Sequence, residues 1–314
     1  MILYKYTSYI TGLKILMEQK IRYTQPFCFN DPFELFPIIE EYFTNEQFED
    51  MLEDITKPQM LDDIFQTQIK NEYDKLSKVQ RSNIPYDIFY IFMKEGLQNE
   101  ILRKNLSFKD WIRNYMLNKE YNMANKINIE YLKLINSYIG ILSLSQTNND
   151  ILMWSHYCNS HSGVVLKLNV DHSFFQHLDK VTYPNSKERP RIKLSRRDYT
   201  QKESLDLYQK VFFSKSPDWS YEKEFRDYKA LVTGDNTGEI DDSGFPIILF
   251  SFPQEIIEGV IFGTRVDSEN IIEFIDKVNN GYKKLIFERA LLDKDKFALN
   301  ICQLSFPSSK VQIQ

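Results

Sequence analysis

The sequence is poor in cysteine and has no recurring cysteine spacing. Its 314 residues include three cysteines, Cys28, Cys158 and Cys302, which are widely spaced and odd in number. This set argues against a disulfide framework and fits a reducing compartment. No Cys-x-x-Cys pair occurs, and His156, Cys158 and His161 are loosely spaced with no fourth ligand nearby. We therefore expect no bound metal.

Long apolar runs and glycine-rich loops are also missing. No stretch reaches the roughly eighteen apolar residues that a membrane-spanning helix requires, and the N-terminal residues do not resemble a secretory leader. We therefore expect a soluble, cytoplasmic protein without a membrane partner. Walker, G-x-G-x-x-G and G-x-S-x-G motifs are missing, which leaves the common glycine-rich nucleotide sites unsupported. The net charge of -5 gives no overall attraction to nucleic acid.

The hydrophobic content is 42%, enough for a substantial core, and the order of patterns predicts an α+β protein. We predict one domain over residues 1–314, with a mixed or antiparallel sheet and a mainly helical insertion at 45–137. The predicted strands are 2–7, 21–24, 138–145, 164–169, 181–183, 221–232, 247–252, 259–263, 285–291 and 297–304. The predicted helices outside the insertion are 9–20, 151–158, 195–213 and 268–279, and 234–244 is predicted to be an acidic loop.

The start of the predicted strand 221–232 carries the clearest chemical pattern. On a strand, Glu222, Glu224 and Arg226 would project from one face. Such a row also occurs on ion-paired, solvated strand faces. The preceding Trp219 and the Ser-Lys-Ser-Pro turn at 214–217 favour a site, because a Glu-x-Glu pair can stabilise positive charge.

Other candidate site residues lie at the ends of predicted strands, where loops commonly carry function. Asn30 and Asp31 form a turn between two prolines, and this turn is either purely structural or part of the pocket. Ser143, Ser145, Trp154, His156 and Tyr157 lie between two predicted core strands.

Five separated blocks resemble the signature of the bacterial domain-of-unknown-function 2971 family and occur in its order. They are Leu3-Tyr4-Lys5-Tyr6-Thr7, Asn30-Asp31-Pro32-Phe33-Glu34, Leu142-Ser143-Leu144-Ser145, Met153-Trp154-Ser155-His156-Tyr157 with Gly163, and Trp219-x-x-Glu222-x-Glu224-Phe225-Arg226. The resemblance runs over nearly the whole chain, and the helical block matches least. The resemblance implies membership of this family but does not assign an activity.

The layout is also similar to that of ADP-ribosyltransferases. This resemblance implies NAD as co-substrate, with Glu224 as the carboxylate that stabilises an oxocarbenium-like transition state while nicotinamide leaves. It makes Glu222 the residue that orients the acceptor. Many of these enzymes hold the nucleotide with a His or Arg on the first strand, and the first strand here has neither. Either Lys5 or Tyr6 takes that role, or the resemblance is architectural only. The implied NAD-contacting residues are Tyr4, Tyr6, Thr7, Asn30, Asp31, Ser143, Ser145, Trp154, His156, Tyr157, Trp219 and Arg226.

The leading hypothesis is therefore an ADP-ribosyltransferase-like toxin or effector in bacterial anti-phage defence, acting on an unidentified macromolecular or small-molecule acceptor. Two alternatives stay open. A metal-dependent nuclease would use Asp218, Asp227 and Lys229. A non-catalytic binding or sensor module would present its helical insertion to a protein partner, and would keep its function after Glu224→Gln.

Overall fold

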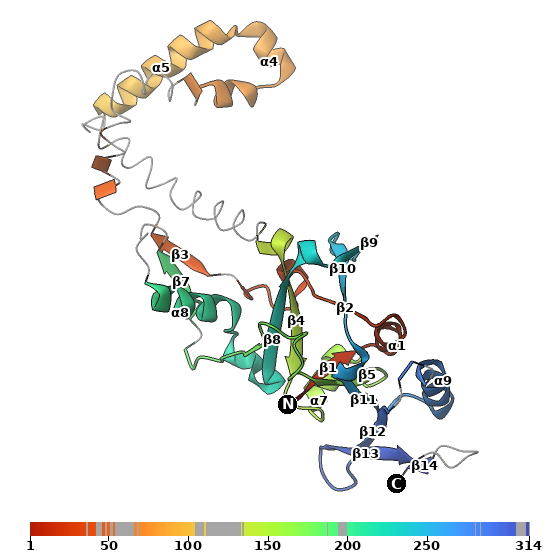
Figure 1. Cartoon of the computed structure of the whole chain (residues 1–314). Coiled ribbons are helices and arrows are strands. Elements are labelled where there is room, and N and C mark those ends of the chain that lie inside the picture. The colour runs from red at the N-terminus through yellow and green to blue at the C-terminus, as the bar shows by residue number, and fades with distance from the viewer. Residues whose placement is uncertain are drawn as a thin grey trace. The chain divides into compact units, whose positions relative to one another are not determined.

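The computed structural model describes residues 1–35, 37–41, 46–47, 49–50, 53, 66–67, 69–103, 110, 133, 135–186, 188–193, 200–279, 281–282, 284–305 and 312–313. The chain forms two compact units (Figure 1). Unit 1 comprises Met1–Pro37, Tyr131–Pro190 and Gln201–Gln314, and unit 2 comprises Ile38–Glu130 and Arg191–Thr200.

The centre of unit 1 is a large mixed sheet, which confirms the α+β class. Among the described residues, its strand order is β14-β13-β12-β11-β5-β1-β4-β8-β6. The β11–β12 pair is parallel, whereas β1 pairs antiparallel with both β4 and β5, and β4 with β8. The strands are β1 (Ile2–Thr7), β4 (Ile139–Ser145), β5 (Val164–Asn169), β6 (Asp179–Lys180), β8 (Glu224–Ala230), β11 (Ile257–Phe262), β12 (Ile286–Leu292), β13 (Leu299–Ser305) and β14 (Gln312–Ile313).

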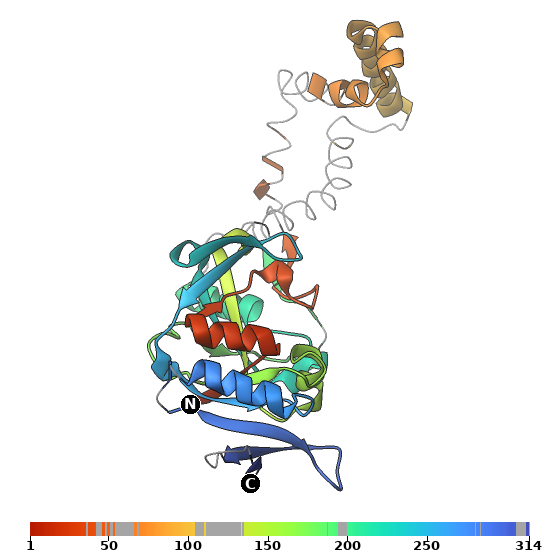
Figure 2. The ribbon, with the colours of Figure 1, turned by 90° about the vertical axis from the view of Figure 1, so that its right-hand side faces the viewer.

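Helices α1 (Tyr9–Glu18) and α9 (Ser268–Val278) lie side by side on one face of this sheet (Figure 2). The Ser8 side chain caps α1 by accepting a hydrogen bond from the Thr11 backbone N–H, which satisfies a helix-end donor. Helix α9 buries residues at helical spacing, from Ile271 to Val278. A larger core lies under these two helices.

The opposite face of the sheet packs against α7 (Ile151–Tyr157). The two faces of the sheet therefore have separate cores. Along β5, Val164 and Leu166 belong to the larger core under α1 and α9, whereas Val165 belongs to the smaller core beside α7. A second sheet in unit 1 has the order β2-β10-β9, formed by β2 (Lys20–Arg22), β10 (Pro246–Ser251) and β9 (Asp235–Ile240). Helix α8 (Gln201–Phe212) precedes the turn that leads to β8.

The sequence predictions for the start of β8 and for residues 234–244 were wrong. The strand predicted from residue 221 begins at Glu224, because residues Pro217–Glu222 form a short 3-10 helix, η2. Pro217 stands in its first turn, and the Ser216 side chain caps it. The predicted loop at 234–244 contains strand β9, whose residues are all exposed. Without a buried face, this strand shows no alternation of apolar and polar residues.

Unit 2 pairs β3 (Ile38–Glu41) with β7 (Arg191–Lys193) in parallel and contains helices α4 (Lys78–Asn83) and α5 (Tyr86–Arg103). Ser77 and Gln80 form a capping box at the start of α4. Both helices fall within the predicted insertion, but about half of residues 45–137 lie outside the described residues. The description of the chain as one domain with an insertion stays a prediction.

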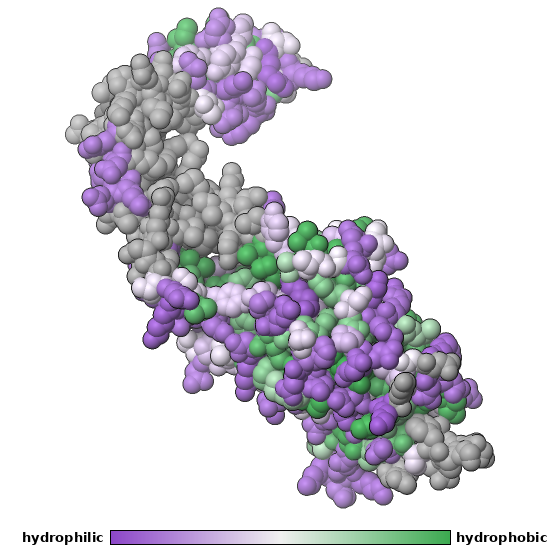
Figure 3. Space-filling view, viewed as in Figure 1, coloured by the Kyte–Doolittle hydropathy of each residue, from purple (hydrophilic) through white to green (hydrophobic). Residues whose placement is uncertain are grey.

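Hydrophilic residues predominate on the face of unit 1 seen in Figure 3, with hydrophobic residues interspersed. Scattered exposed apolar side chains are normal for folded domains and do not mark a site. No helix in the described part of the chain is long and apolar enough to span a membrane. The informative feature is therefore in the interior, where charged side chains are buried.

Candidate functional site

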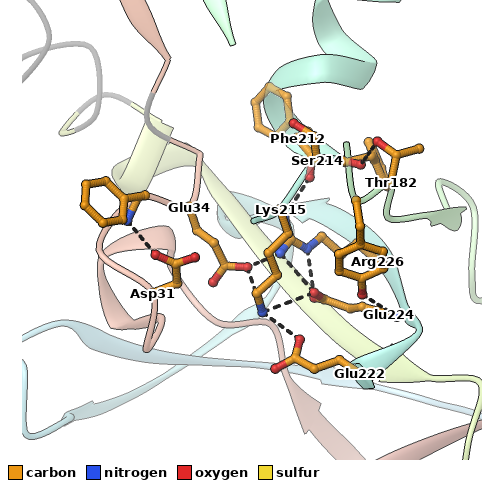
Figure 4. Close-up of polar contacts among 12 residues, drawn as sticks. Asp31, Glu34, Thr182, Phe212, Ser214, Lys215, Glu222, Glu224 and Arg226 are labelled. Atoms are coloured by element: carbon orange, nitrogen blue, oxygen red, sulfur yellow. Dashed lines mark hydrogen bonds and ion pairs between the residues drawn. The ribbon is translucent and has the colours of Figure 1, made fainter. Parts of the chain in front are cut away.

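A cluster of buried charged side chains lies beside the start of β8 (Figure 4). Lys215, Glu222, Glu224 and Arg226 are between 1% and 8% exposed, and the side chain of Glu34 is 5% exposed. Charged groups are seldom buried unless they are paired, because burial removes their hydration. We call these five residues the charged cluster.

Two neighbouring elements position three members of the charged cluster. Glu224 and Arg226 stand two residues apart on β8 and share one face of that strand. Glu222 is the last residue of η2, and Lys223 then adopts a left-handed conformation with φ 45°. The prediction that Glu222 shares the strand face was therefore wrong, although its carboxylate still reaches the same place.

The Lys215 ammonium joins all three carboxylates of the charged cluster. Its Nζ lies 2.6 Å from Glu222 Oε2, 3.1 Å from Glu34 Oε1 and 3.4 Å from Glu224 Oε2. The same Nζ lies 4.8 Å from the centre of the Trp219 ring, which adds a cation–π contact. Glu222 and Glu224 are therefore held beside one cation.

Arg226 fixes the carboxylate of Glu224 with a two-point contact. Its Nε donates to Glu224 Oε1 at 2.8 Å and its Nη2 donates to Glu224 Oε2 at 3.1 Å. Its Nη1 donates to the Phe212 backbone carbonyl at 2.8 Å, and its Nη2 also contacts Glu34. Such two-point pairing gives both strength and a defined geometry.

The environments of the carboxyl groups shift their pKa values in opposite directions. Burial on its own would raise the pKa of Glu224, but Arg226 and Lys215 outweigh it and lower this pKa to about 2. Burial raises the pKa of Glu222 above its ordinary value, although Lys215 and Tyr157 oppose it. Burial likewise raises the pKa of Glu34 against the opposing effect of Arg226. Glu224 is therefore the carboxyl group that stays ionised, and Glu222 can exchange a proton.

A cavity of about 250 Å³ opens beside Glu222 and Glu224. The strand register aligns Tyr4 with Ser145, and Ser145 with Glu224, across three neighbouring strands. The predicted site residues that line this cavity are Tyr4, Tyr6, Asn30, Ser143, Ser145, Tyr157, Glu222 and Glu224.

Lys5 also lines this cavity and supplies a cation from β1. Its Nζ donates to the Ser143 backbone carbonyl at 3.1 Å. Burial lowers the pKa of Lys5 to about 8, while the negative charge of Glu224 opposes that effect. The charge of Lys5 is therefore sensitive to pH within the range in which enzymes usually work.

Two lining residues position Glu222. The Tyr157 hydroxyl donates to Glu222 Oε1 at 2.6 Å, and the Ser145 hydroxyl donates to the Glu222 backbone carbonyl at 2.6 Å. The backbone and the carboxyl group of Glu222 are therefore both held in place at the cavity lining.

The remaining predicted site residues lie away from the cavity lining. Trp154 is fully buried and donates to the Asn148 backbone carbonyl at 2.8 Å, so it supports the fold. His156 is exposed on α7, and Thr7 is buried at the end of β1. Asp31 accepts a hydrogen bond from the Phe33 backbone N–H at 2.9 Å, which is the turn interaction that its sequence context favours.

A second cavity of about 440 Å³ lies beside the first. Asp31 and Trp219 line it, and Glu34 and Lys215 line both cavities. The charged pair of Glu34 and Lys215 therefore forms part of the wall between two spaces in unit 1.

Asp227 and Lys229, which belong to the nuclease alternative, form an ion pair with each other, with Lys229 Nζ 3.9 Å from Asp227 Oδ2. Asp227 is fully buried, follows Arg226 on β8 and therefore projects from the opposite strand face. It accepts hydrogen bonds from the Tyr23 hydroxyl and the His177 backbone N–H, each at 2.7 Å. Among the described residues, no group of three or more His, Cys, Asp or Glu side chains is arranged to hold a metal ion.

Sequence reasoning missed the roles of Glu34 and Lys215. Lys215 stands in the Ser-Lys-Ser-Pro turn at 214–217, and Glu34 ends the block of residues 30–34. Both residues therefore lie within stretches that the sequence marks as part of a site. Neither stretch indicates by itself that its charged residue is buried. That information comes only from the fold, which brings Glu34 to Arg226 across 192 residues of sequence.

A family model matches residues 153–226, and its description is "Protein of unknown function (DUF2971)". This part of the chain is similar to the DUF2971 family. The family resemblance is thereby confirmed over this range, which contains all of the charged cluster except Glu34. Comparisons with curated proteins and with solved structures gave no match.

The charged cluster should be sensitive to the loss of one cation. We expect Arg226→Met to lower the free energy of unfolding by about 3–5 kcal/mol, because it leaves buried carboxylates without their partner. Denaturant titration would measure this loss. Arg265→Met, at an exposed position, is the matched control and should have little effect. Equal stability of the two variants would contradict the assignment.

Proposed function

We propose that the chain cleaves the bond between nicotinamide and ribose in NAD and transfers ADP-ribose to an acceptor. The observation that carries this proposal is the pair Glu222 and Glu224, held on one ammonium with pKa values shifted in opposite directions. Carboxyl groups separated in this way are suited to different roles in one reaction.

Glu224 would stabilise the transition state. When nicotinamide leaves with the bonding electrons, positive charge develops on the ribose ring. An ionised carboxylate fixed in a site that excludes water opposes this charge without having to reorganise. Arg226 and Lys215 keep Glu224 ionised and in place.

Glu222 would accept the proton of the attacking acceptor group. Its raised pKa makes it a better base than an ordinary carboxylate, provided that it is deprotonated when the reaction begins. Tyr157 and Lys215 orient its two oxygens. The acceptor then forms a bond to the ribose carbon that nicotinamide has left.

The cavity supports the proposed ligand by its size and its lining. Its volume of about 250 Å³ lies just below the ~300–1,000 Å³ of typical small-molecule pockets, so it suits one part of NAD rather than the whole molecule. We assign the nicotinamide–ribose part to it. The alignment of Tyr4, Ser145 and Glu224 supports the resemblance to the ADP-ribosyltransferase layout, with Lys5 as the first-strand cation. A toxin or effector role in defence stays a prediction.

Nicotinamide release from NAD tests this function. We expect purified wild type to release nicotinamide, with or without cell extract as a source of acceptors. The rate of release should be at least about a hundredfold lower in Glu224→Gln, because this variant lacks one fixed charge in the site. Glu239→Gln, on the exposed strand β9, is the control and should match wild type. No release by folded wild type under any condition would contradict the function.

The pH profile of kcat/KM should be bell-shaped. Activity should rise with pH as Glu222 loses its proton above the ordinary carboxyl range, and fall above pH about 8 as Lys5 loses its charge. Lys5→Arg keeps the charge, so the alkaline limb should move to higher pH, whereas Lys14→Arg at an exposed position should leave it in place. An alkaline limb unchanged in Lys5→Arg would show that another group causes it.

A further inference from the structure

The three carboxylates of the charged cluster are held by different kinds of local structure. Glu222 and Glu224 belong to η2 and β8, which are hydrogen-bonded elements of unit 1. Glu34 lies in the turn that follows the short 3-10 helix η1 (Pro26–Cys28), outside any helix or strand. The next residue, Leu35, has φ 59°, which is unfavourable for a side chain with a Cβ. Glu34 is therefore the one carboxylate of the three that no helix or strand holds.

The charged cluster itself holds three carboxyl groups and two cations, and a further cation, Lys5, lines the cavity beside it. Lys215 and Arg226 supply two positive charges, and Glu222 and Glu224 can balance them with two negative charges. Glu34 adds a third carboxylate to the same buried place, where it contacts Lys215 Nζ at 3.1 Å and also Arg226 Nη2. A buried carboxylate beyond the number of cations is costly. The two cations therefore hold one more anionic group than Glu222 and Glu224 supply.

The position of Glu34 supports the same conclusion. Together with Lys215 it lines both the 250 Å³ cavity and the 440 Å³ cavity. Arg226 lines neither cavity, but removal of the Glu34 carboxylate would open the space that it fills to its two partners, Lys215 Nζ and Arg226 Nη2. Lys5 lines the smaller cavity, so cations from three separate parts of the chain would then be available to one ligand.

We propose that Lys215 and Arg226 form a binding site for a phosphate group of a ligand, and that Glu34 occupies this site in the free protein as an internal substitute. A ligand carrying a phosphate displaces the Glu34 carboxylate, and the turn at 29–35 moves with it. Arginine and lysine together favour phosphate, since the guanidinium donates two hydrogen bonds and the ammonium adds a compact charge. The inference rests on the proposed function only in assigning this phosphate to the diphosphate of NAD.

Binding of inorganic pyrophosphate, measured by isothermal titration calorimetry, tests the proposal. A tethered carboxylate competes with the ligand at an effective concentration on the order of millimolar or more. We therefore expect Glu34→Gln and Glu34→Ala to bind pyrophosphate at least about tenfold more tightly than wild type. Glu188→Gln, an exposed carboxylate that lines the larger cavity, makes the same charge change and should bind like wild type.

Several results would overturn the proposal. Unchanged or weaker pyrophosphate binding by folded Glu34→Gln would show that Glu34 does not compete with an anion. An equal gain in Glu188→Gln would show a general charge effect. Failure of both Glu34 variants to fold would show that Glu34 is a structural member of the charged cluster. Because the readout is not NAD cleavage, this test can fail while nicotinamide release succeeds, and the reverse.

Discussion

A single ammonium group, the Nζ of Lys215, lies within 3.4 Å of three carboxylates in the interior of unit 1. The rest of the site depends on this contact, because carboxylates so close together would repel one another without a cation between them. Arg226 also donates two hydrogen bonds to the Glu224 carboxylate. The result is a pair of cavity-lining carboxyl groups with different affinities for protons, and the proposed chemistry uses that difference.

The large sheet explains how these groups are held. Strands β1, β4 and β8 are neighbours, and their register places Tyr4, Ser145 and Glu224 in one line. A core on each face of the sheet fixes these strands, with α1 and α9 over one face and α7 against the other. Helix α7 also contributes Tyr157, which binds Glu222 directly. Residues 153–226, which match the DUF2971 model, therefore contain every member of the charged cluster except Glu34, together with Tyr157.

The sequence predicts the regular parts of this fold well. Strands 2–7 and 164–169 match β1 and β5 because their apolar residues are dense and their ends are marked by turn residues. Strand β9 was missed because all its residues are exposed. The start of β8 was placed too early because Tyr221 and Glu222 belong to the 3-10 helix η2, which the Ser216 side chain caps. The spacing of Glu222 and Glu224 marked them as a pair, and both carboxylates contact Lys215. Lys215 and Glu34 could not be recognised in this way, since their burial depends on contacts between distant parts of the chain.

The central claim is that Glu222 and Glu224 differ in proton affinity although they share one cation. Carboxyl-carbon NMR titration, with Glu222→Gln and Glu224→Gln used to assign the signals, tests it most directly. The account predicts that Glu224 stays ionised until the pH approaches about 2, while Glu222 titrates above its ordinary range. Titration of both groups near the ordinary glutamate value of 4.5 in the folded protein would contradict it.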